Sequence, residues 1–217
     1  MKTAAAVLLA LCAVAFGEDA PATMTKLMVK FESPEVPKDS FAGQPKRMYR
    51  AASGYCRVEE NPDLEHGIHG LMIINEPDIW MINRLDKTAQ HIVDPTPPYN
   101  CRMPIFVTGD EIHSAEDVRK PLMELEFGRE LEYFRSMSAA AAPGPVMRGK
   151  ATTAYVVRAG GSLLVLFTTG DPEAPVAVVR NHDNTHETFW YGEYAQVPFD
   201  PQLFAKPEGV KIEEPKR

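Results

Sequence analysis

The chain has 217 residues, with 23 Lys and Arg against 30 Asp and Glu and a formal net charge of −7. This acidic balance argues against a nucleic-acid partner, because contacts with phosphates need clustered Lys and Arg, and against electrostatic docking on anionic lipid headgroups. The length suits one large domain or two small ones.

The first 17 residues predict a cleavable secretory signal peptide. Lys2 supplies a positive charge, the apolar run Ala4–Phe16 follows, and small residues flank Phe16 where cleavage would occur. The run is shorter than the roughly 20 residues of a membrane-spanning helix. An uncleaved amphipathic or membrane helix is the alternative. Cys12 lies inside the run, but the Leu before it fits a lipid-attachment motif poorly. We therefore expect a soluble product, periplasmic or secreted, with no transmembrane segment after cleavage.

The first half of the mature chain predicts a flexible lead-in over residues 18–25, followed by a single domain over 26–217 that begins with short strands. In the first strand, Leu27, Val29 and Phe31 alternate with more polar positions, which is typical of a half-buried strand. Turn residues separate the next runs. The expected strands are Lys26–Glu32, Arg47–Ala52, Tyr55–Glu59, Gly67–Ile74, Ile79–Asn83 and Gln90–Val93.

Cys56 and Cys101 are the cysteines that remain after cleavage. In an oxidising compartment such a pair favours one disulfide. In the chain-entropy model this disulfide would stabilise the fold by roughly 4 kcal/mol. Two separate reduced thiols are the alternative. The pair lacks the Cys-x-x-Cys arrangement of redox motifs, which argues against redox catalysis.

The middle of the chain predicts one long helix over Lys120–Met137. Its apolar side chains recur every three or four residues, and its charged side chains are expected to face elsewhere. A shorter helix is expected over Ser114–Arg119, and a small-residue linker over Ala139–Pro145. The apolar positions are Met123, Phe127, Leu131 and Phe134, and the charged ones are Glu124, Glu126, Arg129 and Glu130.

The last third predicts mostly strands, because it is rich in Val, Thr, Phe and Tyr with Gly-containing turns between the runs. The expected strands are Ala151–Arg158, Ser162–Thr169, Val176–Arg180, His186–Tyr194 and Val210–Glu213. About ten short strands against one or two helices indicate an α+β fold. We expect an antiparallel sheet with the helices on one side.

Catalytic and metal-binding motifs are weak in this sequence. His66 and His69, and likewise His182 and His186, have spacings that zinc sites use on helices, but here they fall in turns, so we interpret them as turn or surface residues. No serine stands in a Gly-x-Ser-x-Gly motif, and there is no phosphate loop or dinucleotide fingerprint. We therefore predict no metal, no cofactor and no enzymatic activity.

The apolar side chains give more information about a possible ligand site. Methionines at 28, 48, 72, 81 and 103 lie in or beside the strands, and Met suits a cavity that accepts variable apolar ligands, although ordinary core packing is the alternative. If the sheet wraps only partly around the helix, the space between them is a natural acyl-chain site. By apolar character the candidate pocket residues are Met72, Trp80, Phe127, Leu131, Phe134 and Trp190.

Two segments carry a family resemblance. The first is an apolar strand from Gly67, a strand ending in Trp80-Met-Ile-Asn83, and Lys87-Thr-Ala-Gln-His-Ile-Val-Asp94; the second contains Asp200-Pro-Gln-Leu-Phe204 and Pro207-Glu-Gly-Val210. Together they resemble the strand meander and the closing pattern of the periplasmic lipoprotein-carrier (LolA-like) superfamily. The sequence departs from that pattern, since it lacks a clear helix before the first strand and has a long helix in mid-chain.

The resemblance implies a strongly curved, unclosed antiparallel sheet, a half-barrel, whose concave face is covered by helices. It also implies a non-catalytic exported protein that binds or carries a lipid or a lipoprotein acyl chain in the bacterial cell envelope, where an envelope protein could be a further partner. Two other functions stay open at this point. One is a structural or protein-interaction module with a filled core, and the other is an envelope hydrolase with an unmarked active site.

Overall fold

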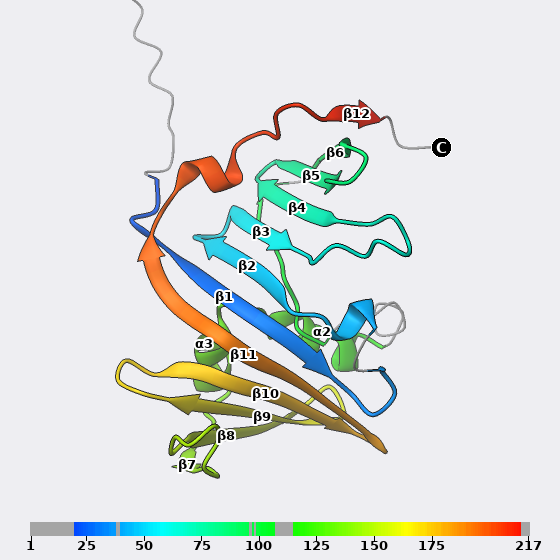
Figure 1. The fold of residues 1–217 in the computed structure, drawn as a ribbon. Coiled ribbons are helices and arrows are strands. Elements are labelled where there is room, and N and C mark those ends of the chain that lie inside the picture. Colours follow the sequence, from blue (N-terminus) through cyan, green and yellow to red (C-terminus); the bar gives the residue numbers. More distant parts are fainter. Residues whose placement is uncertain (1–19, 38–39, 96, 98, 107–114, 214–217) are drawn as a thin grey trace, which may run out of the picture.

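The computed structural model describes residues 20–37, 40–95, 97, 99–106 and 115–213, so the predicted signal peptide lies outside the described residues. These residues form one twelve-stranded sheet with the order β12-β6-β5-β4-β3-β2-β1-β11-β10-β9-β8-β7 (Figure 1). The strands are β1 Thr23–Glu32, β2 Lys46–Ala51, β3 Tyr55–Glu59, β4 Gly70–Asn75, β5 Asp78–Asn83, β6 Thr88–Val93, β7 Ala141–Pro143, β8 Thr153–Ala159, β9 Ser162–Thr169, β10 Ala174–His182, β11 Thr185–Pro198 and β12 Lys211–Glu213.

Near the centre of the sheet lies the antiparallel pair β1–β11, which joins strands that are far apart in the sequence. Thr23 lies opposite Pro198 at one end of the pair and Glu32 opposite Thr188 at the other, with a register shift at Met28/Val29. Such an irregularity bends a strand and increases its twist. Strand β1 begins at Thr23, within the range expected as a flexible lead-in.

The α+β half-barrel expected from the sequence is confirmed. The sheet is curved and unclosed, with β7 and β12 at its two ends, and helices α2 (Glu116–Glu124) and α3 (Glu130–Ser136) lie together on its concave side, behind the strands in Figure 1. Neighbouring strands are antiparallel except β12, which pairs in parallel with β6. Two short 3-10 helices, η1 (Phe41–Gly43) and η2 (Pro201–Phe204), complete the described elements.

The single helix expected over Lys120–Met137 is wrong, because the chain leaves the helix at Leu125 and re-enters it at Glu130. In between, Glu126 pairs with Pro104 as a β-bridge and Gly128 adopts a positive φ of 81°, which favours glycine. Pro121 lies inside α2 rather than in the first turn of a helix. The break lets two short helices follow the curved sheet.

Side-chain alternation separates the two faces of the sheet. Leu27 and Val29 of β1, Leu164 and Leu166 of β9 and Tyr191 of β11 belong to the main core cluster on the concave face. The convex face carries two smaller clusters, one around Phe204 and one around Trp80, which residues from the C-terminal segment help to complete. Among the described residues no helix has the length and apolar character needed to span a membrane.

Candidate ligand-binding face

The concave face is covered by one segment of chain, which we call the cover: the described residues 101–106 and 115–139, including α2 and α3. Its apolar side chains complete the core cluster, among them Leu122, Leu125 and Phe134, which are fully buried. Among the described residues, the main chain of the cover donates one hydrogen bond to the sheet layer, from Cys101 N to the Ser53 carbonyl in the β2–β3 turn, over 2.7 Å. The cover is therefore held chiefly by side chains.

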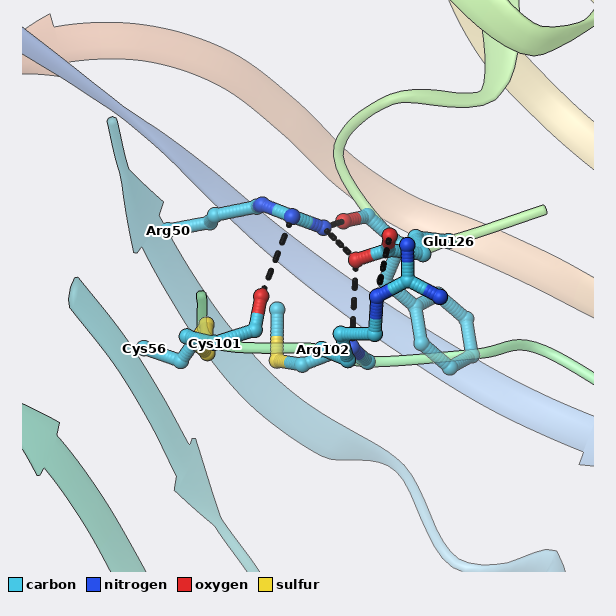
Figure 2. The surroundings of a disulfide bond; sticks show 7 residues. Arg50, Cys56, Cys101, Arg102 and Glu126 are labelled. Carbon is cyan, nitrogen blue, oxygen red and sulfur yellow. Dashed lines mark hydrogen bonds and ion pairs between the residues drawn. A yellow bond between two sulfur atoms is a disulfide. The ribbon is translucent and has the colours of Figure 1, made fainter. Parts of the chain in front are cut away.

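One end of the cover is tied to strand β3 by a disulfide. Cys101 is bonded to Cys56, with 6.2 Å between the two Cα atoms (Figure 2). This confirms the pairing that the sequence favoured over two free thiols. The other end of the cover continues into β7, so its middle is bounded by two fixed points.

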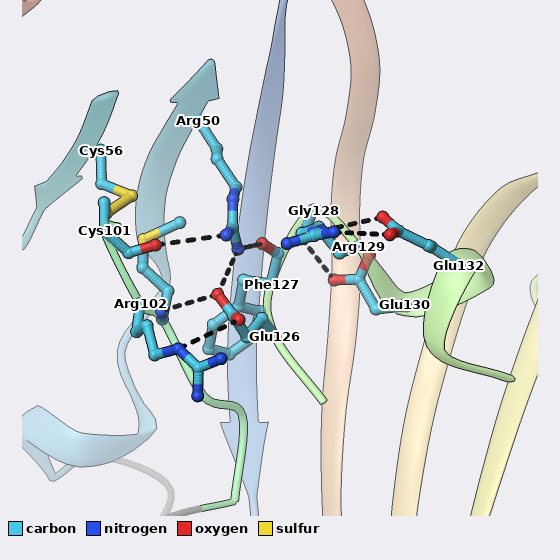
Figure 3. Close-up of polar contacts among 11 residues, drawn as sticks. Arg50, Cys56, Cys101, Arg102, Glu126, Phe127, Gly128, Arg129, Glu130 and Glu132 are labelled. Atoms are coloured by element: carbon cyan, nitrogen blue, oxygen red, sulfur yellow. Dashed lines mark hydrogen bonds and ion pairs between the residues drawn. A yellow bond between two sulfur atoms is a disulfide. The ribbon is translucent and has the colours of Figure 1, made fainter. Parts of the chain in front are cut away.

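A buried ion pair holds the cover beside the disulfide. The Arg50 guanidinium of β2 lies 2.7 Å from the Glu126 carboxylate of the cover, and the two side chains are 4% and 3% exposed. Arg50 also donates to the carbonyls of Phe127 and Cys101, at 3.1 and 3.2 Å (Figure 3). The Met103 amide donates to Glu126 over 3.3 Å. A buried charge needs such partners, because taking it out of water unpaired is costly.

A second buried carboxyl lies at the start of α3. Glu130 is fully buried and accepts hydrogen bonds from the Tyr191 hydroxyl of β11 over 2.6 Å and from the Gly128 amide over 2.8 Å. Burial raises the pKa of the Glu130 carboxyl, and these hydrogen bonds oppose part of that rise. The sequence placed Glu126 and Glu130 away from the core, and this expectation is wrong: both are buried where the cover meets the sheet.

The cover leaves part of the concave face open over strands β4 to β6. Directly opposite residues of an antiparallel pair share a face, and Ile74 of the core cluster lies opposite Ile79, which in turn lies opposite Ile92. Met72 lies opposite Met81 in the same way. Met81 is 41% exposed and Ile92 is 39% exposed. These four residues (Met72, Ile79, Met81 and Ile92), which we call the apolar strip, therefore continue the core to the surface.

The six pocket residues expected from the sequence do not all meet. Phe127, Leu131 and Phe134 lie on the cover and pack within or against the core cluster, and Met72 packs against that cluster from β4. Phe127 and Phe134 are buried among protein side chains, so they line no open cavity here. The sequence analysis counted Met81 among the methionines that suit a cavity but named neither Met81 nor Ile92 as a pocket residue, although their alternation with Trp80 and His91 places them on one face.

The two tryptophans lie on the convex face. Trp80 stacks on His91 with 3.8 Å between the ring centres and belongs to the convex cluster that includes Ile82. Trp190 lies opposite Lys30 and donates from its indole nitrogen to Glu32 over 2.8 Å. The structure thus separates the tryptophans from the other four candidates, and the binding roles of all six stay predictions.

The histidine pairs have local partners. His66 lies 2.8 Å from Asp63, and His186 lies 2.7 Å from Asn181. In the part of the chain that the structure describes, no three His, Cys, Asp or Glu side chains gather into a group that would hold a metal ion. His113 lies outside the described residues.

No family model and no curated protein matches the chain. Among solved structures it is similar to an uncharacterized conserved protein from Thermus thermophilus, with 10% identity over 89% of this chain and 90% of the other and a TM-score of 0.49. It is also similar to a LolA superfamily protein from Nitrosomonas europaea, with 8% identity over 87% and 92% and a TM-score of 0.34. The second belongs to the superfamily that the sequence motifs resemble; neither likeness says what this chain binds.

Proposed function

We propose that this protein is a non-catalytic binding protein or carrier for a hydrophobic ligand, a lipid or an acyl chain, in the bacterial cell envelope. The observation that carries the proposal is the apolar strip, which exposes Met81 and Ile92 on the same face as the buried core. An apolar surface that runs from solvent into a core offers a ligand a path along which it stays out of water. The signal peptide predicted over residues 1–17 supports the location.

Ligand binding would begin on the strip and extend beneath the cover. Methionine side chains adapt to ligands of different shape, and Met72 and Met81 lie side by side at the entrance. The cover is attached at Cys101 and at its junction with β7, while its middle is held by packing and side-chain hydrogen bonds. Among the described residues, separation of the middle from the sheet would break no strand ladder, but it would break the Arg50 contacts with Glu126 and Phe127, so the ligand would have to offset that loss in order to open room for an acyl chain.

The test is ligand binding by the mature protein with a charge placed on the strip. Full burial of a Met side chain stabilises by about 1.5–3 kcal/mol, and Met81 is already partly buried, so its contact with a ligand should contribute about 1 kcal/mol. An Asp in its place adds the cost of desolvating a carboxylate. We expect Met81→Asp to weaken binding of a fatty acid or phospholipid at least tenfold in calorimetry, and to abolish lipid adducts in native mass spectrometry.

Val156→Asp is the matched control. Val156 is 48% exposed on β8, and it alternates with Tyr155 and Val157 of the core, so its side chain lies on the convex face. It adds the same charge at similar exposure on the opposite side of the sheet, and binding should be unchanged. Equal loss in both variants, or a wild-type protein that takes up no fatty acid or phospholipid, would contradict the proposal.

A protein-interaction module is the second candidate, because the space between cover and sheet is filled by side chains such as Phe127 and Phe134. In that case the apolar strip would bind a protein partner rather than a lipid. The native mass spectrum separates the two functions: a clean apoprotein mass that stays unchanged with added lipid favours the interaction module.

A further inference from the structure

A second candidate site lies on the convex face, around Trp190. Lys30 and Trp190 are directly opposite each other on β1 and β11, and their chain neighbours Val29 and Tyr191 point into the concave core. Alternation along a strand therefore directs Lys30 and Trp190 away from the cover. Whatever binds there does not touch the apolar strip.

Two hollows meet at this tryptophan, and both are bordered by Lys30, Glu32 and Trp190. The first, of about 300 Å³, is lined by Phe31 and by Pro34, Val36 and Pro37 of the following loop. The second, of about 480 Å³, is walled by Val146, Met147 and Arg148 of the β7–β8 loop. We call the pair the Trp190 groove. Hollows of this size with mainly apolar walls and a few polar groups are typical of small-ligand sites.

The indole ring of Trp190 is held in place between the two hollows. Its ring nitrogen donates to Glu32 over 2.8 Å, and the Arg148 guanidinium lies over its face, 5.3 Å from the ring centre. Arg148 is itself fixed by a hydrogen bond to the Tyr191 carbonyl over 2.8 Å. A platform fixed in this way loses little conformational freedom when a ligand packs on it.

The charges of the groove favour an anion. Lys30 and Arg148 bring two positive charges, and the Glu32 carboxylate that faces them already accepts hydrogen bonds from Trp190 and from Lys30, the latter over 3.2 Å. The lining of the second hollow thus carries two positive charges against one negative charge, in contrast with the net charge of −7 of the chain. One Arg148 nitrogen bonds the Tyr191 carbonyl, and a guanidinium has further N–H groups that can hold a planar carboxylate.

We propose that the Trp190 groove binds a single-chain fatty carboxylate. Its alkyl chain lies against Trp190 and the Pro34–Pro37 loop, and its carboxylate lies at Arg148 and Lys30. This site is separate from the concave face and does not depend on the proposed carrier function.

Trp190 is also the reporter for the test. The chain has two tryptophans, so Trp80→Phe leaves Trp190 as the single tryptophan, whose emission can be excited selectively over that of the tyrosines. Decanoate, added below the concentration at which it forms micelles, should shift the emission of this protein in a saturable way. Decyltrimethylammonium, with the same chain length and the opposite charge, should not. Calorimetry on the Met81→Asp protein, which keeps both tryptophans and has a weakened concave site, gives the same comparison independently of the Trp80 substitution.

Two arginine variants test whether the carboxylate of the ligand lies at Arg148. Arg148→Gln should weaken decanoate binding at the groove about tenfold, whereas Arg158→Gln, at an exposed arginine of β8 outside the groove, should not. Met81→Asp should leave the decanoate-induced shift of Trp190 emission unchanged. The proposal for this groove and the proposal for the concave face can therefore fail independently. Equal binding of the two amphiphiles, an unresponsive Trp190, or no effect of Arg148→Gln would overturn the proposal.

Discussion

Replacing Arg50 by Met tests how the cover is held. The substitution keeps much of the volume of the side chain but removes the buried partner of Glu126, whose carboxylate is 3% exposed and would keep only weaker contacts, such as Arg102 at 3.9 Å. Breaking a buried ion pair in this way costs about 3–5 kcal/mol. The carbonyls of Phe127 and Cys101 would also lose their donors. We therefore expect Arg50→Met to lower the free energy of unfolding by at least about 3 kcal/mol, measured by urea unfolding of the oxidised protein.

Substitution of Arg102 provides a matched control, and substitution of Glu126 in the Arg50→Met protein provides a second test. The Arg102 guanidinium lies 3.9 Å from the same carboxylate but is 46% exposed, so Arg102→Met should cost no more than about 1 kcal/mol. Adding Glu126→Gln to Arg50→Met removes the buried charge that has lost its closest partner and should recover part of the loss, which a double-mutant cycle measures. Similar costs for the Arg50 and Arg102 variants, or no recovery in the double variant, would refute the role assigned to the pair.

Three further predictions concern the same layer. Cys56→Ser with Cys101→Ser should lower the free energy of unfolding by roughly 4 kcal/mol, and reductant should then leave the urea midpoint of the variant unchanged. Phe134→Ala should cost about 3–5 kcal/mol by calorimetry, because the ring is fully buried; a loss below about 1 kcal/mol would mean that the cover does not pack as described. Glu130 has a raised folded-state pKa, so its contribution to stability is present below the ordinary glutamate value of 4.5 and is lost as the pH rises through the folded-state value. The stability of the wild type relative to Glu130→Gln should thus fall as the pH rises above about 4.5, and a pH-independent difference in urea unfolding would contradict this.

Local patterns predicted the strands better than the cover. The alternation of Leu27 and Val29 with polar neighbours is a property of the strand itself, and it predicted β1 to within a few residues. The helical spacing of Phe127, Leu131 and Phe134 was equally regular, but the main chain at Gly128 departs from the helix. Spacing alone did not reveal the break, because a single glycine is tolerated within helices.

The buried carboxylates were missed for a different reason. Glu126 and Glu130 have polar side chains, and their partners Arg50 and Tyr191 come from strands far away in the sequence. The residues that neighbour either glutamate in the sequence do not indicate that its carboxylate has a buried partner. The fold brings the partners together only when β2 and β11 flank β1 in the sheet.

The side of the sheet on which Trp80 lies could have been predicted from the sequence. Within β5, Trp80 alternates with Ile79 and Met81, so a pocket that contains Met72 and the helix would contain those two residues rather than Trp80. Apolar character alone does not carry this information. Strand alternation combined with one known inward residue, such as Ile74, assigns the whole β4–β6 meander.

The pairing of β1 with β11 also affects the order in which the chain acquires structure. The sheet is completed at its centre by residues near opposite ends of the sequence, Thr23 and Pro198. Contacts of such high sequence separation form slowly, because a large loop must close before they contribute any stability. A chain emerging from the ribosome cannot make this pair until β11 has been synthesised, after the ten strands β1 to β10. The two halves of the sheet on either side of this pair, β2 to β6 and β7 to β10, therefore remain unjoined until β11 has been made.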